Sequence, residues 1–151
     1  MRIESFLQQS PVFQASRIVR RMEGSLNSIL RDEGLTFFES LILAAIFLEK
    51  KGEIQPSELA RTFQTTRGNV SHCVSSLEAK GLVRRRIDPE DARAFQLVLQ
   101  AAGRKRAARV VGILDRMQSR FEESVGVPKL EAMLTEMRAV EEMCSRLAEQ
   151  R

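Results

Sequence analysis

The sequence predicts a mainly α-helical protein with one small β-hairpin, and three observations lead to this fold class. Apolar residues recur at intervals of three and four along most of the 151 residues, which is the period of an amphipathic helix. After Gly81 two short runs of alternating apolar and polar side chains flank a turn-rich segment, a pattern typical of a hairpin. Helical periodicity then returns. With 43% apolar and 29% charged residues, the chain has the composition of one soluble globular domain.

Three helices are expected in the first part of the chain. The first helical region covers residues 3–31. A second helix starts after Thr36, because Thr36 and Glu39 have capping-box spacing, and it continues through the apolar run 41–48. A third, short helix covers residues 56–63 and starts with a proline, whose missing N–H has no partner in a first turn anyway.

A helix-turn-helix and a hairpin are expected next. A helix over residues 67–80 follows the short helix after a very tight link, and two short helices joined in this way make a helix-turn-helix. Gly81 ends this helix, with Leu82 folded back on it in a Schellman-type cap. The hairpin pairs residues 82–87 with residues 95–99.

Two further helices follow the hairpin, and Pro128 opens the last one. Like the first helical region, they carry narrow apolar stripes that must be buried against something. A second subunit is the simplest partner, and a bundle within one chain is the alternative. We therefore predict dimerisation helices at 1–34 and 101–151 and a winged helix-turn-helix at 35–100, all in one structural unit.

The charge is distributed unevenly along the chain. Residues 61–109 contain eleven lysines and arginines against four acids, a net charge of +7, whereas the rest of the chain carries −3. A basic centre in a slightly acidic frame indicates a polyanionic partner, and an ordinary solvated surface is the alternative.

Two motifs in this part of the chain are specific, namely the run Ser-Leu-Glu-Ala-Lys-Gly-Leu-Val-Arg-Arg at 76–85 and the wing motif Asp-Pro-Glu-Asp-Ala-Arg at 88–93. With these motifs the chain resembles the MarR family of bacterial transcriptional regulators. The resemblance covers nearly the whole chain. It implies a two-fold dimer formed by the terminal helices, in which each protomer presents one winged helix to DNA.

The helix at 67–80 is the predicted recognition helix, because the side chains opposite its apolar face are short or polar. They are Arg67, Gly68, Asn69, Ser71, His72 and Ser75. Such side chains let a helix lie deep in the major groove, where asparagine pairs with adenine and arginine with guanine. Thr65 and Thr66, at the helix start, are expected to hold a phosphate, and Ser57 is a weaker phosphate candidate.

The wing carries the remaining candidates for DNA contact. Arg93 at the hairpin tip is expected to enter the minor groove, with Asp91 orienting its guanidinium. Arg84 and Arg86 point to one face of their strand and Arg85 to the other. We expect some of these three arginines to contact phosphates and at least one to pair within the protein or the dimer.

The sequence disfavours an enzyme and a metal or cofactor site. It contains no phosphate-cradling glycine loop, no nucleophile elbow and no zinc-protease motif. His72 and Cys73 are neighbours on a helix and cannot face each other, and Cys73 and Cys144 fit no metal or disulfide spacing. We therefore predict no catalytic residue, no metal and no cofactor. No apolar run is long enough to span a bilayer, and a cytoplasmic location is expected.

The predicted function is that of a homodimeric, sequence-specific regulator, by default a repressor, bound to double-stranded DNA at a pseudo-palindromic operator. Relatives carry arginine where this chain has His72 and threonine where it has Gln100, so their operators do not transfer. A small organic effector and an oxidation-sensing Cys144 stay open, and no ligand-binding residue is assigned. The alternatives are a non-specific architectural DNA binder and a protein-interaction adaptor.

Overall fold

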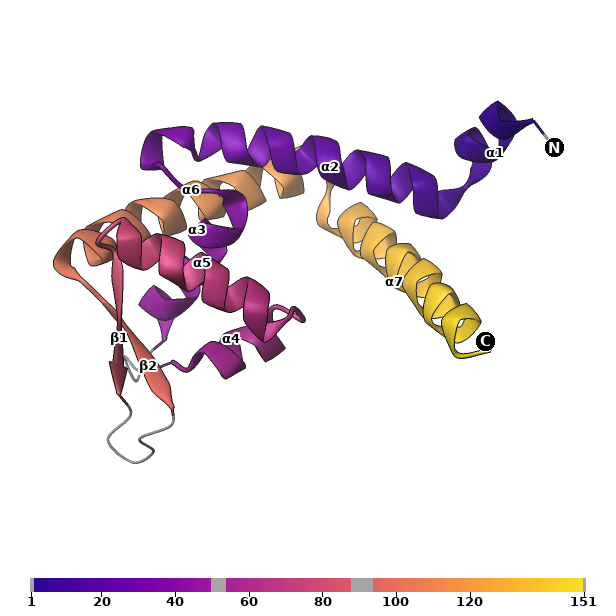
Figure 1. The fold of residues 1–151 in the computed structure, drawn as a ribbon. Coiled ribbons are helices and arrows are strands. Elements are labelled where there is room, and N and C mark those ends of the chain that lie inside the picture. Colours follow the sequence, from indigo (N-terminus) through magenta and orange to yellow (C-terminus); the bar gives the residue numbers. More distant parts are fainter. Residues whose placement is uncertain (1, 50–53, 88–93, 151) are drawn as a thin grey trace. The chain divides into compact units, whose positions relative to one another are not determined.

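The structure is a computed structural model that describes residues 2–49, 54–87 and 94–150 (Figure 1). Its elements are α1 (Ile3–Gln9), α2 (Pro11–Ile29), the 3-10 helix η1 (Arg31–Glu33), α3 (Phe37–Leu48), α4 (Pro56–Thr62), α5 (Arg67–Ala79), β1 (Val83–Ile87), β2 (Phe95–Leu99), α6 (Ala101–Val125) and α7 (Val127–Glu149). This confirms the predicted fold class, a mainly helical chain with one antiparallel hairpin.

The chain divides into two compact units. One comprises residues 26–114 and holds α3, α4, α5, the hairpin and the first half of α6. The other comprises residues 1–25 and 115–151 and holds α1, most of α2, the end of α6 and α7. Both boundaries fall inside long helices, α2 and α6.

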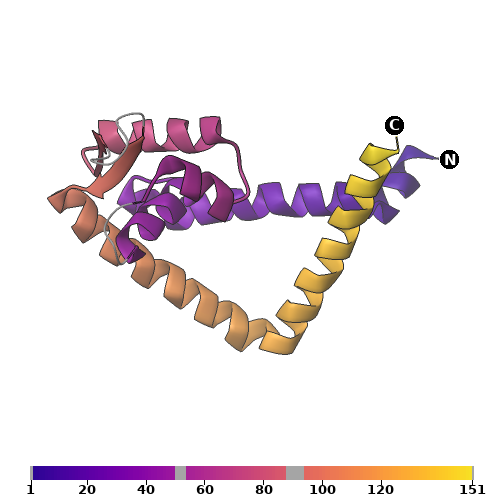
Figure 2. The same cartoon turned by 90° about the horizontal axis from the view of Figure 1, so that it is seen from below.

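The unit of residues 26–114 is built around a single apolar core. In Figures 1 and 2, α5 lies with α4 near its first residues and with the hairpin near its last. The core side chains come mainly from α3, α4, α5, both strands and α6, and include Ile42, Leu43, Leu59, Val70, Val74, Leu77, Leu82, Leu97 and Val110. Each such side chain contributes roughly 1.5–3 kcal/mol on burial, so this core fixes the positions of α4 and α5.

The hairpin pairs as the alternating pattern predicts. Val83 lies opposite Leu99 and Ile87 opposite Phe95, in an antiparallel register. The pattern did not reveal a third segment at Ile54, whose carbonyl accepts a hydrogen bond of 2.9 Å from the Leu97 amide. This bridge extends the two-stranded sheet toward the segment before α4, which ties the hairpin to the helix-turn-helix.

The predicted helix caps are confirmed. The Thr36 hydroxyl accepts a hydrogen bond from the Glu39 amide, and the Glu39 carboxylate accepts one from the Thr36 amide, which completes a capping box at the start of α3. At the end of α5, Gly81 has a left-handed φ of 68° and the Leu82 amide donates to the Leu77 carbonyl. The left-handed Gly81 and this hydrogen bond set the direction in which β1 leaves α5.

The first helical region differs from the prediction, because it is divided into α1 and α2. The break falls at Ser10, which has an extended backbone. Pro11 follows as the first residue of α2, and a proline disfavours a helical conformation in the residue before it. The periodic pattern continued across this position, and the proline decides where the helix is interrupted.

The turn between α4 and α5 contains a strained residue, Gln64, whose φ is 48°. The Gln64 amide donates to the Arg61 carbonyl and the Thr65 amide to the Ala60 carbonyl, so Gln64 occupies a position where glycine is the usual residue. We expect Gln64→Gly to raise the free energy of unfolding by about 0.5–1 kcal/mol, since glycine adopts this conformation without a Cβ clash. Urea denaturation measures the change, and a lower midpoint would contradict the strain argument.

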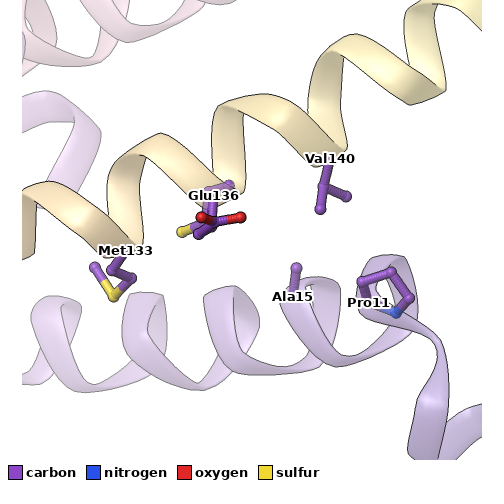
Figure 3. A pocket seen from close by; sticks show the side chains of 6 residues that line it. Pro11, Ala15, Met133, Glu136 and Val140 are labelled. Carbon is purple, nitrogen blue, oxygen red and sulfur yellow. The ribbon is translucent and has the colours of Figure 1, made fainter.

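The unit formed by the terminal helices leaves many large apolar side chains exposed. No residue of α1, α2 or α7 is buried. Ile18, Met133 and Leu147, for example, are each about half exposed or more. Figure 3 shows Met133, Glu136 and Val140 of α7 facing Pro11 and Ala15 of α2 around an open cavity of about 250 Å³.

Candidate nucleic-acid interface

Helix α5 has one buried face and one exposed face, as its sequence predicts. Val70, Cys73, Val74 and Leu77 are buried in the core. The residues proposed to read DNA are all exposed, namely Arg67, Gly68, Asn69, Ser71, His72 and Ser75. The exposed face is thus free of bulky apolar groups and carries amide, hydroxyl, imidazole and guanidinium groups, which are donors and acceptors suited to base edges.

Hydrogen bonds at the start of α5 involve three of the predicted residues. The Thr66 hydroxyl caps the helix by accepting a hydrogen bond of 3.1 Å from the Asn69 amide. The Asn69 side-chain nitrogen donates to the Thr65 hydroxyl at 3.0 Å. Asn69 therefore has a fixed side chain, with its carbonyl oxygen still able to accept a hydrogen bond.

Arg85 connects the hairpin to α5. Its amide donates to Glu78 at 2.8 Å, and its guanidinium forms an ion pair with the same carboxylate. The guanidinium also donates to the Ser75 hydroxyl at 3.1 Å and to the Ser71 carbonyl at 3.3 Å. The expectation that one of the three consecutive arginines pairs within the protein is confirmed, and the Ser75 hydroxyl is held by this arginine.

Replacing Arg85 with methionine is expected to lower the free energy of unfolding by about 1–2 kcal/mol, because the part-buried Glu78 carboxylate and the Ser75 hydroxyl lose their partner. Arg84→Met is the matched control. Arg84 is exposed on the opposite face of the same strand, and its loss should change stability by less than about 0.5 kcal/mol. Urea denaturation compares the two variants, and equal effects would show that the link to α5 contributes nothing.

Of the other predicted wing residues, the structure describes Arg84 and Arg86. Arg84 and Arg86 are exposed, and Arg86 donates to the Gln96 side chain at 2.8 Å. This hydrogen bond holds the Arg86 side chain close to the surface of the sheet, so the side chain does not extend fully into solvent. Asp91 and Arg93 lie outside the described residues.

Sequence reasoning missed one basic residue of this surface, Arg61. It lines an open hollow of about 470 Å³ between α4 and the start of α5, together with Ser57, Ala60, Thr65 and Arg67. Arg61 is the next-to-last residue of α4, where a cation that offsets the helix dipole is common, so its sequence position gave no functional signal.

Glu39 anchors α5 to α3 from inside the protein and is only 6% exposed. Besides the Thr36 amide, it accepts hydrogen bonds from the Ser76 hydroxyl at 2.5 Å and from the Lys80 ammonium at 2.7 and 2.8 Å. Burial raises the pKa of this carboxyl, but the hydrogen bonds from Lys80, Ser76 and Thr36 outweigh burial and lower the pKa below its ordinary value. The carboxylate is therefore ionised at neutral pH and fixes the position of α5.

Cys73 lies beside this carboxylate, on the buried face of α5. Burial, with a smaller contribution from the charge of Glu39, raises the pKa of the Cys73 thiol to about 12. The thiol is therefore protonated at neutral pH and is a poor nucleophile. Cys73 is therefore a packing residue of the core.

A second ion-pair cluster holds α6 against the segment before α3. Arg109 donates to the Glu33 carboxylate at 2.9 and 3.1 Å, and Arg106 donates to the Glu33 carbonyl at 2.7 Å. The hydrogen bond from Arg109 lowers the pKa of Glu33. These two arginines of the basic central region are thus used within the protein, and they do not add to the surface around α5.

Residues 2–49, 54–87 and 94–150 contain neither a candidate membrane span nor a candidate metal-binding cluster. Within these ranges no helix is both long and apolar enough to cross a membrane. Nor does this part of the chain bring together three or more histidine, cysteine, aspartate or glutamate side chains that could hold a metal ion.

Comparison with known sequences places the winged helix-turn-helix in a family. Residues 33–94 match the MarR family. The chain is 32% identical over 94 residues to the transcriptional repressor MprA of Escherichia coli K12, and 29% identical over 87 residues to the HTH-type transcriptional regulator PrsX of Escherichia coli. Each match covers 58% of this chain and 52% of the relative, so the chain spans about half the length of these curated relatives.

Comparison with solved structures extends the likeness to the terminal helices. The Mycobacterium tuberculosis regulator MosR, solved in complex with DNA, has a TM-score of 0.72 and 26% identity, over 90% of this chain and 98% of MosR. The Staphylococcus aureus MepR–DNA complex has a TM-score of 0.75 over 89% of this chain and 96% of MepR, and its 21% identity shows the fold alone.

Proposed function

We propose that the chain is a member of the MarR family, which its residues 33–94 match, and that it is a sequence-specific DNA-binding transcriptional regulator that acts as a homodimer. The two copies of α5 enter successive major grooves of a pseudo-palindromic operator, about one helical turn apart. Arg93 of each wing enters the flanking minor groove. The protein is not an enzyme. It works in the cytoplasm, and repression by exclusion of polymerase is its default mode.

The exposed polar face of α5 is the observation that carries this proposal. Its residues are small or hydrogen-bonding and exposed, while the opposite face packs into the core. The helix is held firmly by Glu39 from α3 and by Arg85 from the hairpin. A rigid helix with such a face suits the major groove, which is about 12 Å wide. MosR, a relative of the same fold, was solved bound to DNA.

The exposed apolar residues of the terminal helices support the homodimer. A soluble protein rarely leaves so many large apolar side chains in water, and here they recur along α1, α2, the end of α6 and α7. A second copy of the same helices offers a matching surface through two-fold symmetry. Sedimentation equilibrium at micromolar concentration should give a dimer mass of about twice 17.1 kDa, and a monomer would contradict this part of the proposal.

DNA binding is tested by fluorescence anisotropy across a salt series. The purified protein is titrated into a duplex from the region upstream of its own gene and into a scrambled duplex of equal composition. We expect tight, salt-dependent binding with a preference for the native duplex. Arg93→Ala should weaken binding to the native duplex by about 1–3 kcal/mol, and unchanged affinity would remove the wing from the mechanism.

The same titration separates the alternatives. Equal binding to both duplexes would favour a non-specific architectural protein. No binding at low salt would exclude the DNA-binding proposal and favour a protein-interaction adaptor. If the preference is found, adding small organic acids to the preformed complex tests for an effector, which should release the DNA.

A further inference from the structure

The hollow between α4 and the start of α5 has a chemistry suited to an anion. Its wall carries two guanidinium groups, from Arg61 and Arg67, two hydroxyl groups, from Ser57 and Thr65, and the methyl group of Ala60. Among the residues that the structure describes, no carboxylate lines it. The one acid of α4, Glu58, accepts a hydrogen bond of 2.8 Å from the Gln55 amide in the capping box at the helix start.

Neither arginine of the hollow is engaged elsewhere in the described ranges. Arg61 and Arg67 are both exposed, and neither guanidinium group forms a hydrogen bond or ion pair with another described residue. They differ in this from Arg85, Arg106 and Arg109, whose guanidinium groups pair with glutamates. Two unpaired guanidinium groups around one hollow repel each other, so an anion between them is favoured.

The hydroxyl of Thr65 strengthens this arrangement. Its oxygen accepts the hydrogen bond from the Asn69 side chain, which leaves the hydroxyl proton available to a ligand. The planar guanidinium groups offer paired N–H donors that match two oxygens of a phosphate. The hollow is open to solvent, so a phosphate that is part of a polymer can enter it.

We propose that Arg61 and Arg67 together hold one backbone phosphate of the bound DNA, with the Thr65 hydroxyl as a further donor. This inference rests on the proposed function, because the phosphate is the one beside the groove that α5 enters. Arg67 is the first residue of α5, so the clamp sets how far the helix moves into the groove. Its contribution is independent of base sequence, whereas Asn69, Ser71 and His72 read bases.

The test uses Arg61→Gln, Arg67→Gln and the double variant of the full-length protein in the same salt series. Arg138→Gln, an exposed arginine of α7, is the charge-matched control. Each single variant should bind about tenfold more weakly, by the same factor for the native and the scrambled duplex. The slope of log affinity against log salt should become shallower by about 2, because each of the two protomers loses one phosphate contact.

The double variant distinguishes one shared phosphate from two separate ones. If both arginines of a protomer hold the same phosphate, the slope of the double variant should also become shallower by about 2 in total, and the two losses of affinity should not add. A change of about 4 with additive losses would overturn the shared clamp. An unchanged slope for Arg61→Gln, or a loss confined to the native duplex, would overturn it as well.

Thermal denaturation monitors folding, and Arg61→Lys provides a second measurement that does not depend on Arg61→Gln. The lysine keeps the charge at the end of α4 but lacks the paired donors, so it should keep the wild-type salt slope and bind more weakly. A wild-type affinity for Arg61→Lys would contradict the clamp. Failure of the wild-type protein to bind any duplex would instead overturn the proposed function, so the two failures are distinguishable.

Discussion

Replacing Gly103 with alanine is expected to lower the free energy of unfolding by about 3–5 kcal/mol. Gly103 is buried in the first turn of α6, and a Cβ there would lie 1.9 Å from the carbonyl oxygen of Leu82 and 2.7 Å from its carbonyl carbon. That carbonyl cannot move aside freely, because it accepts a hydrogen bond of 2.9 Å from the Gln100 amide while the Leu82 side chain is buried. Urea denaturation measures the loss.

Gly24→Ala is the matched control for this substitution. Gly24 lies inside α2, and nothing is found within 4 Å of the position where its Cβ would be. Alanine is the better helix former there, so we expect this variant to be more stable by about 0.5–1 kcal/mol. Equal midpoints for Gly103→Ala and the wild type would show that α6 and the start of the hairpin are not in close contact.

Replacing Glu39 with alanine is expected to cost about 3 kcal/mol at neutral pH. The variant loses the capping box of α3 and leaves the Ser76 hydroxyl and the Lys80 ammonium without their acceptor. Because the Lys80 side chain is one-third exposed, solvent screens its ion pair, and we assign most of the loss to the cap and to Ser76. Since Glu39 joins α3 to α5, DNA affinity should fall as well.

Glu39→Gln tests the charge separately, with a smaller expected loss of about 1–2 kcal/mol at pH 7. The pKa of Glu39 is lower in the folded protein than its ordinary value of 4.5, so the stability from its charge is fully present above about pH 4.5 and is lost as pH falls through the folded-state pKa. The stability difference between wild type and Glu39→Gln should therefore shrink below pH 4.5. A difference that is the same at pH 3 and pH 7 would contradict the role of the carboxylate charge.

Features formed between near neighbours in the chain were predictable from the sequence. The capping box of Thr36 and Glu39, the left-handed Gly81 and the pairing of the hairpin strands depend on local backbone geometry and on residue spacing. The same applies to the two faces of α5, because a period of 3.6 residues separates the buried Val70 and Leu77 from the exposed residues between them.

The local sequence pattern did not predict every local feature of the fold. It placed one continuous helical region before residue 31, and the structure divides that region at Ser10 because Pro11 follows. The sequence pattern also gave no functional role to Arg61, which it placed only in the last turn of a short helix.

The amino-acid sequence alone was sufficient for the class of fold, the order of its elements, the family resemblance and the exposed polar face of α5. Only the tertiary structure decided which charged side chains form ion pairs and hydrogen bonds within the protein. Glu39 meets Lys80 across 41 residues and Arg109 meets Glu33 across 76. Helical and strand periods specify which face of an element is apolar, but not which element packs against it. The packing of α3, α4, α5 and α6 therefore determined that Arg85 supports α5, while Arg61 and Arg67 remain available to a phosphate.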